Sequence, residues 1–156
     1  MNKFQEAENI GRALLESFLK QIGATNWQPT TDKYDPVDYY FEYKGHKVVV
    51  EIKCRDIKYK DYSTHMIEDS KLKALLKAKE DNQCDFAYYI NFFGGDTVFW
   101  YNASNVISKA TKSYVHCNRT TAINTGKVDK QTWMIPTNTA LIFILWNGKW
   151  RKSYFN

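Results

Sequence analysis

Apolar residues recur at helical spacing near the start of the chain and predict a helix over residues 4–22. Gly23 follows as the expected C-cap. A second helix is predicted over residues 66–79, where Glu68 and Asp69 suit the positive end of the helix dipole. The first helix buries a stripe made of Phe4, Ala7, Gly11, Leu14, Phe18 and Ile22, widened by Leu15 and Leu19.

Between and after these helices the pattern predicts strands. A hairpin is expected from residues 37–43 and 46–54 around Lys44-Gly45, and a second from 140–146 and 149–154 around Asn147-Gly148. Further strands are predicted at 85–91 and 97–101. Residues 24–36 are expected to hold at most one short strand, Ser104 to cap a short helix to Lys112, and 116–131 to form a loop or irregular hairpin.

This order of helices and strands is typical of an α/β (α+β) protein with a mixed sheet. The chain has 156 residues, 44% of them hydrophobic and 25% charged, which excludes a disordered or disulfide-framework protein. Because there is no repeat or linker, residues 1–156 are expected to form a single domain.

The first hairpin carries the candidate chemistry. A two-residue turn pairs Tyr43 with His46, and continuing that register places Asp38 opposite Glu51. Lys53 lies on the same face, about 6.6 Å further along the strand. A three-residue turn would instead put Asp38 and Glu51 on opposite faces, so the prediction depends on register.

Two opposed carboxylates repel each other unless a positive charge lies between them. Oxygen ligands suit Mg²⁺ or Mn²⁺, and a nearby amine such as Lys53 can act on a water molecule that attacks a phosphate. Glu51 interrupts the apolar run Val48-Val49-Val50, which indicates a buried central strand and a carboxylate that needs a partner. The spacing alone also fits ordinary cross-strand ion pairs on a half-exposed hairpin.

Asp38 followed by Glu51-Ile52-Lys53, between an amphipathic helix and a Lys-bearing helix, resembles the PD-(D/E)XK nuclease superfamily. That superfamily includes restriction endonucleases, Holliday junction resolvases, and phage and mobile-element nucleases. The resemblance implies a restriction-endonuclease-like αβββαβ core over about residues 4–101 with a mixed central sheet, and a C-terminal β-hairpin elaboration over about 102–156. It implies metal binding by Asp38, Glu51 and the Ile52 carbonyl, and a catalytic Lys53.

The proline of the motif departs from the family pattern, because Pro36 stands two residues before Asp38 instead of next to it. Asp35 is the alternative acid, but its parity is wrong for the face of Glu51. Members of the family often carry one more acid on the first helix, for which Glu8 is the first candidate and Glu16 the alternative.

Basic residues near this motif are candidates for DNA contacts. Lys71 on the second helix fits the position where family members often place a Lys or Gln, and Arg55, Lys58 and Lys60 precede that helix. A solvated surface is the alternative interpretation for each. Trp100, Trp133, Trp146 and Trp150 are expected mainly in the core, with stacking on bases as the alternative.

The net charge of +5 mildly favours a polyanionic partner. Three cysteines without close spacing, a polar N-terminus and no membrane-length apolar run predict a cytoplasmic protein, in a host cell if a phage encodes it. The leading hypothesis is therefore a Mg²⁺-dependent DNA endonuclease that can act as a homodimer, as many nucleases of this fold do. The alternatives are a non-catalytic nucleic-acid-binding module on the same fold and an unrelated interaction domain.

Overall fold

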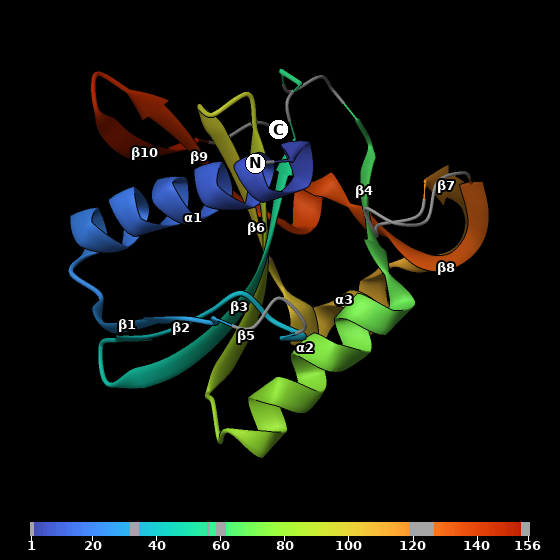
Figure 1. The fold of residues 1–156 in the computed structure, drawn as a ribbon, viewed down its shortest axis with the longest axis horizontal. Coiled ribbons are helices and arrows are strands. Elements are labelled where there is room, and N and C mark those ends of the chain that lie inside the picture. The colour runs from blue at the N-terminus through green and yellow to red at the C-terminus, as the bar shows by residue number, and fades with distance from the viewer. Residues whose placement is uncertain (1, 32–34, 56, 59–61, 119–126, 154–156) are drawn as a thin grey trace.

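A seven-stranded mixed sheet forms the centre of the structure, a computed structural model that describes residues 2–31, 35–55, 57–58, 62–118 and 127–153 (Figure 1). Only β3 and β5 run parallel; the other neighbouring strands pair antiparallel. Across the sheet the strands are β1 (Thr25–Pro29), β2 (Tyr39–Tyr43), β3 (His46–Arg55), β5 (Phe86–Phe93), β6 (Thr97–Asn102), β9 (Leu141–Trp146) and β10 (Lys149–Ser153).

Two helices cover opposite faces of this sheet. Helix α1 (Lys3–Ile22) packs Leu15, Phe18 and Leu19 against Val48 and Val50 of β3. Helix α2 (Asp69–Asp81) lies over the other face, in the core that holds Val49. Strand β3 is therefore buried on both sides, as its apolar run predicted.

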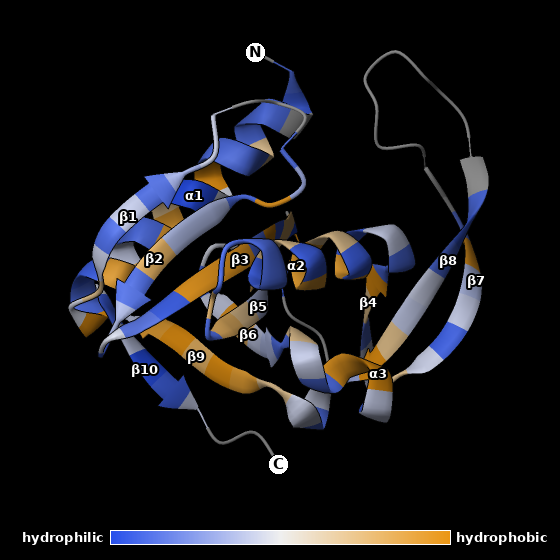
Figure 2. Cartoon of the chain, turned by 90° about the horizontal axis from the view of Figure 1, so that it is seen from below, coloured by the Kyte–Doolittle hydropathy of each residue, from blue (hydrophilic) through white to orange (hydrophobic). Residues whose placement is uncertain are grey.

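A smaller sheet lies beside the main one and joins β4 (Thr64–Glu68), β8 (Lys127–Pro136) and β7 (Thr111–Asn118) in that order. Figure 2 shows β7 and β8 standing apart from the main sheet. The remaining elements are η1 (Ala103–Asn105), α3 (Val106–Lys109) and η2 (Thr137–Thr139). No helix in the described part of the chain has the length and apolar character needed to cross a bilayer.

Local chemistry accounts for the ends of α1 and for both predicted hairpins. The Asn2 side chain accepts a hydrogen bond from the Gln5 amide at 2.9 Å, and Gly23 ends the helix at φ 78°. Lys44 and Gly45 have φ values of 51° and 78°, the signature of a type I′ turn that matches strand twist. Tyr43 pairs with His46, so the predicted register is confirmed.

Two expectations about secondary structure were wrong. The second helix begins at Asp69 rather than Met66, because His65 and Ile67 alternate inward in β4 and that strand pairs with β8, far along the chain. Asn102, not Ser104, caps the 3₁₀ turn, and α3 ends at Lys109. Of the loop or irregular hairpin expected over residues 116–131, the hairpin is confirmed: residues 116–118 of β7 pair antiparallel with residues 127–129 of β8, and residues 119–126 lie outside the described part.

The mixed central sheet and the C-terminal hairpin are confirmed, and β9 attaches that hairpin to β6. The predicted order of core elements holds as α1, β1–β3, α2 and β5, with β4 inserted before α2. Trp100 and Trp150 are buried as expected and Trp133 is half-buried. Trp146 contradicts the core prediction because it is 62% exposed.

Gly11 allows α1 to approach β3 closely. A Cβ atom there would lie 3.0 Å from Ile52 Cγ2 and 3.5 Å from the Cys54 Cβ. We predict that Gly11→Val lowers the free energy of unfolding by about 1–3 kcal/mol more than Ala13→Val at an exposed position of the same helix. Urea denaturation of both variants measures the difference. Equal losses would show that α1 does not need this close contact.

Candidate active site at the divergence of β2 and β3

The site begins where the β2–β3 ladder ends. The last regular pair is Tyr39 with Val50, and the Asp38 amide still donates to the Val50 carbonyl at 3.0 Å. Past this point a cleft of about 790 Å³ opens between the first half of α1 and the start of α2. Its lining includes Glu8, Arg12, Asp38, Glu51, Ile52, Lys53, Arg55, Glu68 and Lys71.

Asp38 is fixed by the backbone of the strand that it faces. Its Oδ2 accepts a hydrogen bond from the Ile52 amide at 2.7 Å. Backbone groups of successive residues in a strand point to opposite edges, so Ile52 presents its N–H and C=O on the same edge as Val50. Because β2 no longer pairs there, Asp38 takes the Ile52 N–H, and the Ile52 carbonyl faces the side that β2 has left.

Glu51 is 7% exposed and lies within the parallel β3–β5 pair opposite Tyr89. Lys71 of α2 places its Nζ 3.1 Å from Glu51 Oε1, and the Asp38 carboxyl is within hydrogen-bonding reach. Burial, followed by the charge of Asp38, raises the pKa of Glu51 to about 8, although Lys71 opposes this rise. Burial also raises the pKa of Asp38 against the opposing effects of the Ile52 N–H, Lys71 and Arg12.

Arg12 of α1 is a site residue that the sequence analysis missed. Its Nη2 lies 3.1 Å from Glu8 Oε1, 4.0 Å from Asp38 Oδ1 and 3.3 Å from Thr30 Oγ1. The four-residue spacing of Glu8 and Arg12 was the available signal, since such pairs meet on one helix face. Each of the two carboxyl groups thus has a cation from a different helix, Arg12 for the half-buried Asp38 and Lys71 for the buried Glu51.

Lys53 reaches the cleft from the same face of β3 as Glu51. Lys53 is exposed, yet partial desolvation of its amine in the cleft, followed by the charges of Arg55 and Lys71, lowers its pKa, while Glu68 and Glu51 oppose the shift. A larger share of this amine is therefore neutral near pH 7 than for a lysine in water. A neutral amine can accept a proton, which general base chemistry requires.

The structure separates the other predicted site residues. Glu8 lines the cleft, whereas Glu16 accepts a 2.7 Å hydrogen bond from the Tyr39 hydroxyl and is absent from the lining. Asp35 is exposed and is likewise not a lining residue.

The predicted DNA-contacting residues also fall in different places. Arg55 lines the cleft, and its guanidinium carbon lies over the Phe93 ring, 5.9 Å from the ring centroid. Lys71 forms an ion pair with Glu51. Lys58 is exposed beside Gly94 at the rim, and Lys60 lies outside the described residues.

The residues present fit a hard divalent cation. Burial raises the pKa of both Asp38 and Glu51, and the charge of Asp38 raises the pKa of Glu51 further, so a bound cation would stabilise both carboxylates. The Ile52 carbonyl adds a third oxygen. Within the described ranges no group of three or more His, Cys, Asp or Glu side chains is arranged to hold a metal. The remaining ligands would be water or substrate oxygens, which suits Mg²⁺ because it keeps several waters.

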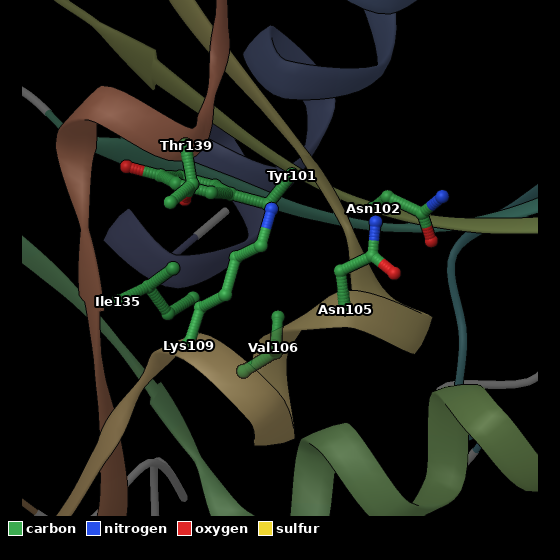
Figure 3. Close-up of a pocket in the computed structure, with 7 residues that line it drawn as sticks. All are labelled: Tyr101, Asn102, Asn105, Val106, Lys109, Ile135 and Thr139. Atoms are coloured by element: carbon green, nitrogen blue, oxygen red, sulfur yellow. The ribbon is translucent and has the colours of Figure 1, made fainter.

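A second cavity lies away from these carboxyl groups. Its volume is about 30 Å³. Figure 3 shows the residues that line it, which are Tyr101, Asn102, Asn105, Val106, Lys109, Ile135 and Thr139. It has room for a water molecule or two and none for a nucleotide. The cleft at Asp38 and Glu51 is therefore the candidate site.

Comparison with known proteins supports the fold. No family model and no curated protein sequence matches the chain. Among solved structures, the chain is similar to Hjc, a Holliday junction resolvase from the archaeal hyperthermophile Archaeoglobus fulgidus, with a TM-score of 0.52 and 12% sequence identity. The match covers 82% of this chain and 88% of the resolvase. The fold is restriction-endonuclease-like, as the sequence analysis expected.

The raised pKa of Glu51 links folding stability to pH. The folded-state pKa of about 8 lies above the ordinary value of 4.5, so the stabilisation is complete below pH 4.5 and is lost as the pH rises through 8. We predict that, in EDTA, Glu51 lowers the free energy of unfolding of the wild type by on the order of 3 kcal/mol between pH 5 and pH 8. Glu51→Gln should not show this decrease. Urea unfolding of wild type and variant at both pH values measures this.

Wild type and Glu51→Gln must be compared because His65 changes folding stability with pH in the opposite direction to Glu51. Burial, then Arg55, lowers the pKa of His65 to about 4, which costs stability below its ordinary value of 6.5 in both proteins. Only the difference between wild type and Glu51→Gln isolates Glu51. Parallel stability profiles for the two proteins would contradict the prediction.

Proposed function

We propose that this protein is a divalent-metal-dependent DNA nuclease of the PD-(D/E)XK superfamily, with its active site in the cleft of Asp38 and Glu51. The observation that supports this most directly is the convergence of Asp38, Glu51 and Lys53 at the point where β2 leaves β3. The fold shared with a Holliday junction resolvase supports the same reading. The proposal includes DNA as partner and allows a homodimer.

In this proposal Asp38, Glu51 and the Ile52 carbonyl hold Mg²⁺ or Mn²⁺. When bound, such an ion activates a water molecule and offsets charge on the phosphate. Lys53 orients the attacking water or accepts its proton, which its lowered pKa favours. Water adds to phosphorus, one phosphorus–oxygen ester bond breaks, and the leaving oxygen takes up a proton.

Arg12, Lys71 and Glu8 have supporting roles in the proposal. Arg12 holds the Asp38 carboxylate at the cleft, and Glu8 holds Arg12 through a 3.1 Å ion pair. Lys71 compensates the charge of Glu51, which would otherwise be buried without a cation. Arg55 and Lys58 at the rim would contact phosphates of the DNA.

Metal binding is testable apart from activity. We predict that Mg²⁺ at ten times its Kd stabilises the wild type by about 1.4 kcal/mol and raises Tm by about 3–5 °C. Asp38→Asn should lose this shift because it removes one carboxylate ligand. Asp35→Asn is the matched control, an exposed acid three residues earlier, and should keep it. Thermal unfolding with Mg²⁺ and with EDTA gives the comparison, and an unchanged shift in Asp38→Asn would count against the site.

Catalysis by Lys53 is tested by substitution. We predict that Lys53→Ala lowers the rate of Mg²⁺-dependent DNA cleavage at least about 100-fold while DNA affinity stays within about 3-fold. The matched control is Lys47→Ala, at the other end of the same face of β3, which should cut at nearly the wild-type rate. Plasmid, linear duplex, single-stranded and branched DNA are each incubated with Mg²⁺, Mn²⁺ or EDTA.

Two outcomes would contradict the assignment. Wild-type cleavage by Lys53→Ala would remove the catalytic role of this lysine. Salt-dependent DNA binding by the wild type without cleavage of any substrate would favour the non-catalytic binding module.

A further inference from the structure

The tip of the β9–β10 hairpin carries an exposed tryptophan that the active site does not use. Trp146 is 62% exposed, and Lys149 lies directly opposite it across the Asn147-Gly148 turn. Arg151 follows on the same face of β10. Among the described residues neither Lys149 nor Arg151 takes part in an ion pair, and both are exposed.

Strand register places this tip at the same end of the sheet as the cleft. One row of cross-strand neighbours runs from Arg55 through Phe93, Thr97 and Ile144 to Arg151. Paired residues share a face, so Arg151 projects from the face of the sheet that carries Glu51 and Arg55. Four strand spacings separate the two arginines, which amounts to about 19 Å.

Trp146 and Lys149 lie two residues beyond this row along β9 and β10, about 6.6 Å closer to the hairpin turn. The turn at Gly94 and Gly95 lies between the cleft and the hairpin, with little side-chain bulk. Among the described residues along this path, Asp96 is the exposed acid, against the four basic residues Arg55, Lys58, Lys149 and Arg151. The path from cleft to hairpin therefore has an excess of positive charge.

We propose that Trp146, Lys149 and Arg151 bind an unpaired DNA strand next to the cleavage site, with Trp146 stacking on a base. This inference rests on the proposed function and names its substrate class, DNA that carries a single-stranded segment beside the cut. An exposed indole beside cations is the combination that single-strand binding uses, because every base offers a face for stacking.

The twist of the sheet favours a flexible strand as the occupant. Neighbouring strands rotate by roughly 20–25°, so the face at β10 is turned well away from that at β3. Duplex DNA has a persistence length of about 150 base pairs and resists such a path, whereas a single strand follows it.

The charge on β10 argues against a second copy of this chain as the occupant. Strand β10 is an edge strand, and Figure 2 shows it as strongly hydrophilic beside the hydrophobic β9. Lysine and arginine on an edge strand oppose pairing with another copy, since like charges would meet. The same charges attract the phosphates of DNA.

The test is fluorescence anisotropy of labelled DNA with the full chain carrying Lys53→Ala, in EDTA, so that no DNA is cut. The probes are a blunt duplex and the same duplex with a single-stranded tail. We expect Trp146→Ala to weaken binding of the tailed duplex about 10-fold and that of the blunt duplex less than 2-fold. Trp146→Phe should retain most of the affinity because it keeps a ring.

Tyr114→Ala is the matched control, because Tyr114 is an aromatic residue 74% exposed on β7 in the smaller sheet. It should leave both affinities unchanged. Lys149→Ala should reduce the slope of log affinity against log salt by about 1 on the tailed duplex. Thermal unfolding of each variant checks that the fold is intact.

Equal affinities of wild type and Trp146→Ala for the tailed duplex would overturn the inference, as would equal losses on both probes. A change of oligomeric state in Trp146→Ala, seen by light scattering, would instead assign the tip to an interface between copies and also overturn it. If the parent protein binds neither probe, the proposed nuclease function fails as well. If the wild type cuts DNA and Trp146→Ala behaves like it, only this inference fails.

Discussion

The structure depends on one buried carboxyl group, Glu51, in a strand that packs against a core on each of its faces. A carboxylate inside a strand with cores on both faces costs free energy unless charge and hydrogen bonds compensate it. Here Lys71 reaches it from α2 and Asp38 shares the site. Burial and the charge of Asp38 nevertheless raise the pKa of Glu51 to about 8, so Lys71 offsets their effect only in part.

The surrounding elements maintain that arrangement. The early end of the β2–β3 ladder leaves the backbone of Ile52 exposed to Asp38, and the helix on each face supplies one cation. Gly11 lets α1 lie close enough to β3 for Arg12 to reach the edge of the cleft. Packing and site chemistry thus meet in the same few residues of β3, where Ile52 contacts α1 while Glu51 and Lys53 face the cleft.

Sequence patterns failed where an element depends on a distant partner. Met66 and Ile67 continue a helix pattern locally, but pairing with β8 draws them into β4. Arg12 looked like an ordinary charged residue of an amphipathic helix, and only the position of α1 against Asp38 brings it into the site. Trp146 was expected in the core because tryptophan is usually buried, whereas it lies two residues beyond Ile144, the last residue that β9 pairs with β6, and its indole is exposed.

The sequence by itself determined α1, both two-residue hairpins, the mixed sheet and the pairing register that brings Asp38, Glu51 and Lys53 together. These features follow from local periodicity and turn chemistry, because a two-residue turn sets which side chains share a face. Tertiary structure alone decided which cations meet the two carboxyl groups, that Glu8 and not Glu16 lines the cleft, and that the β9–β10 tip lies at the same end of the sheet. These relations join residues that are far apart in the chain, and a local sequence pattern does not predict such contacts.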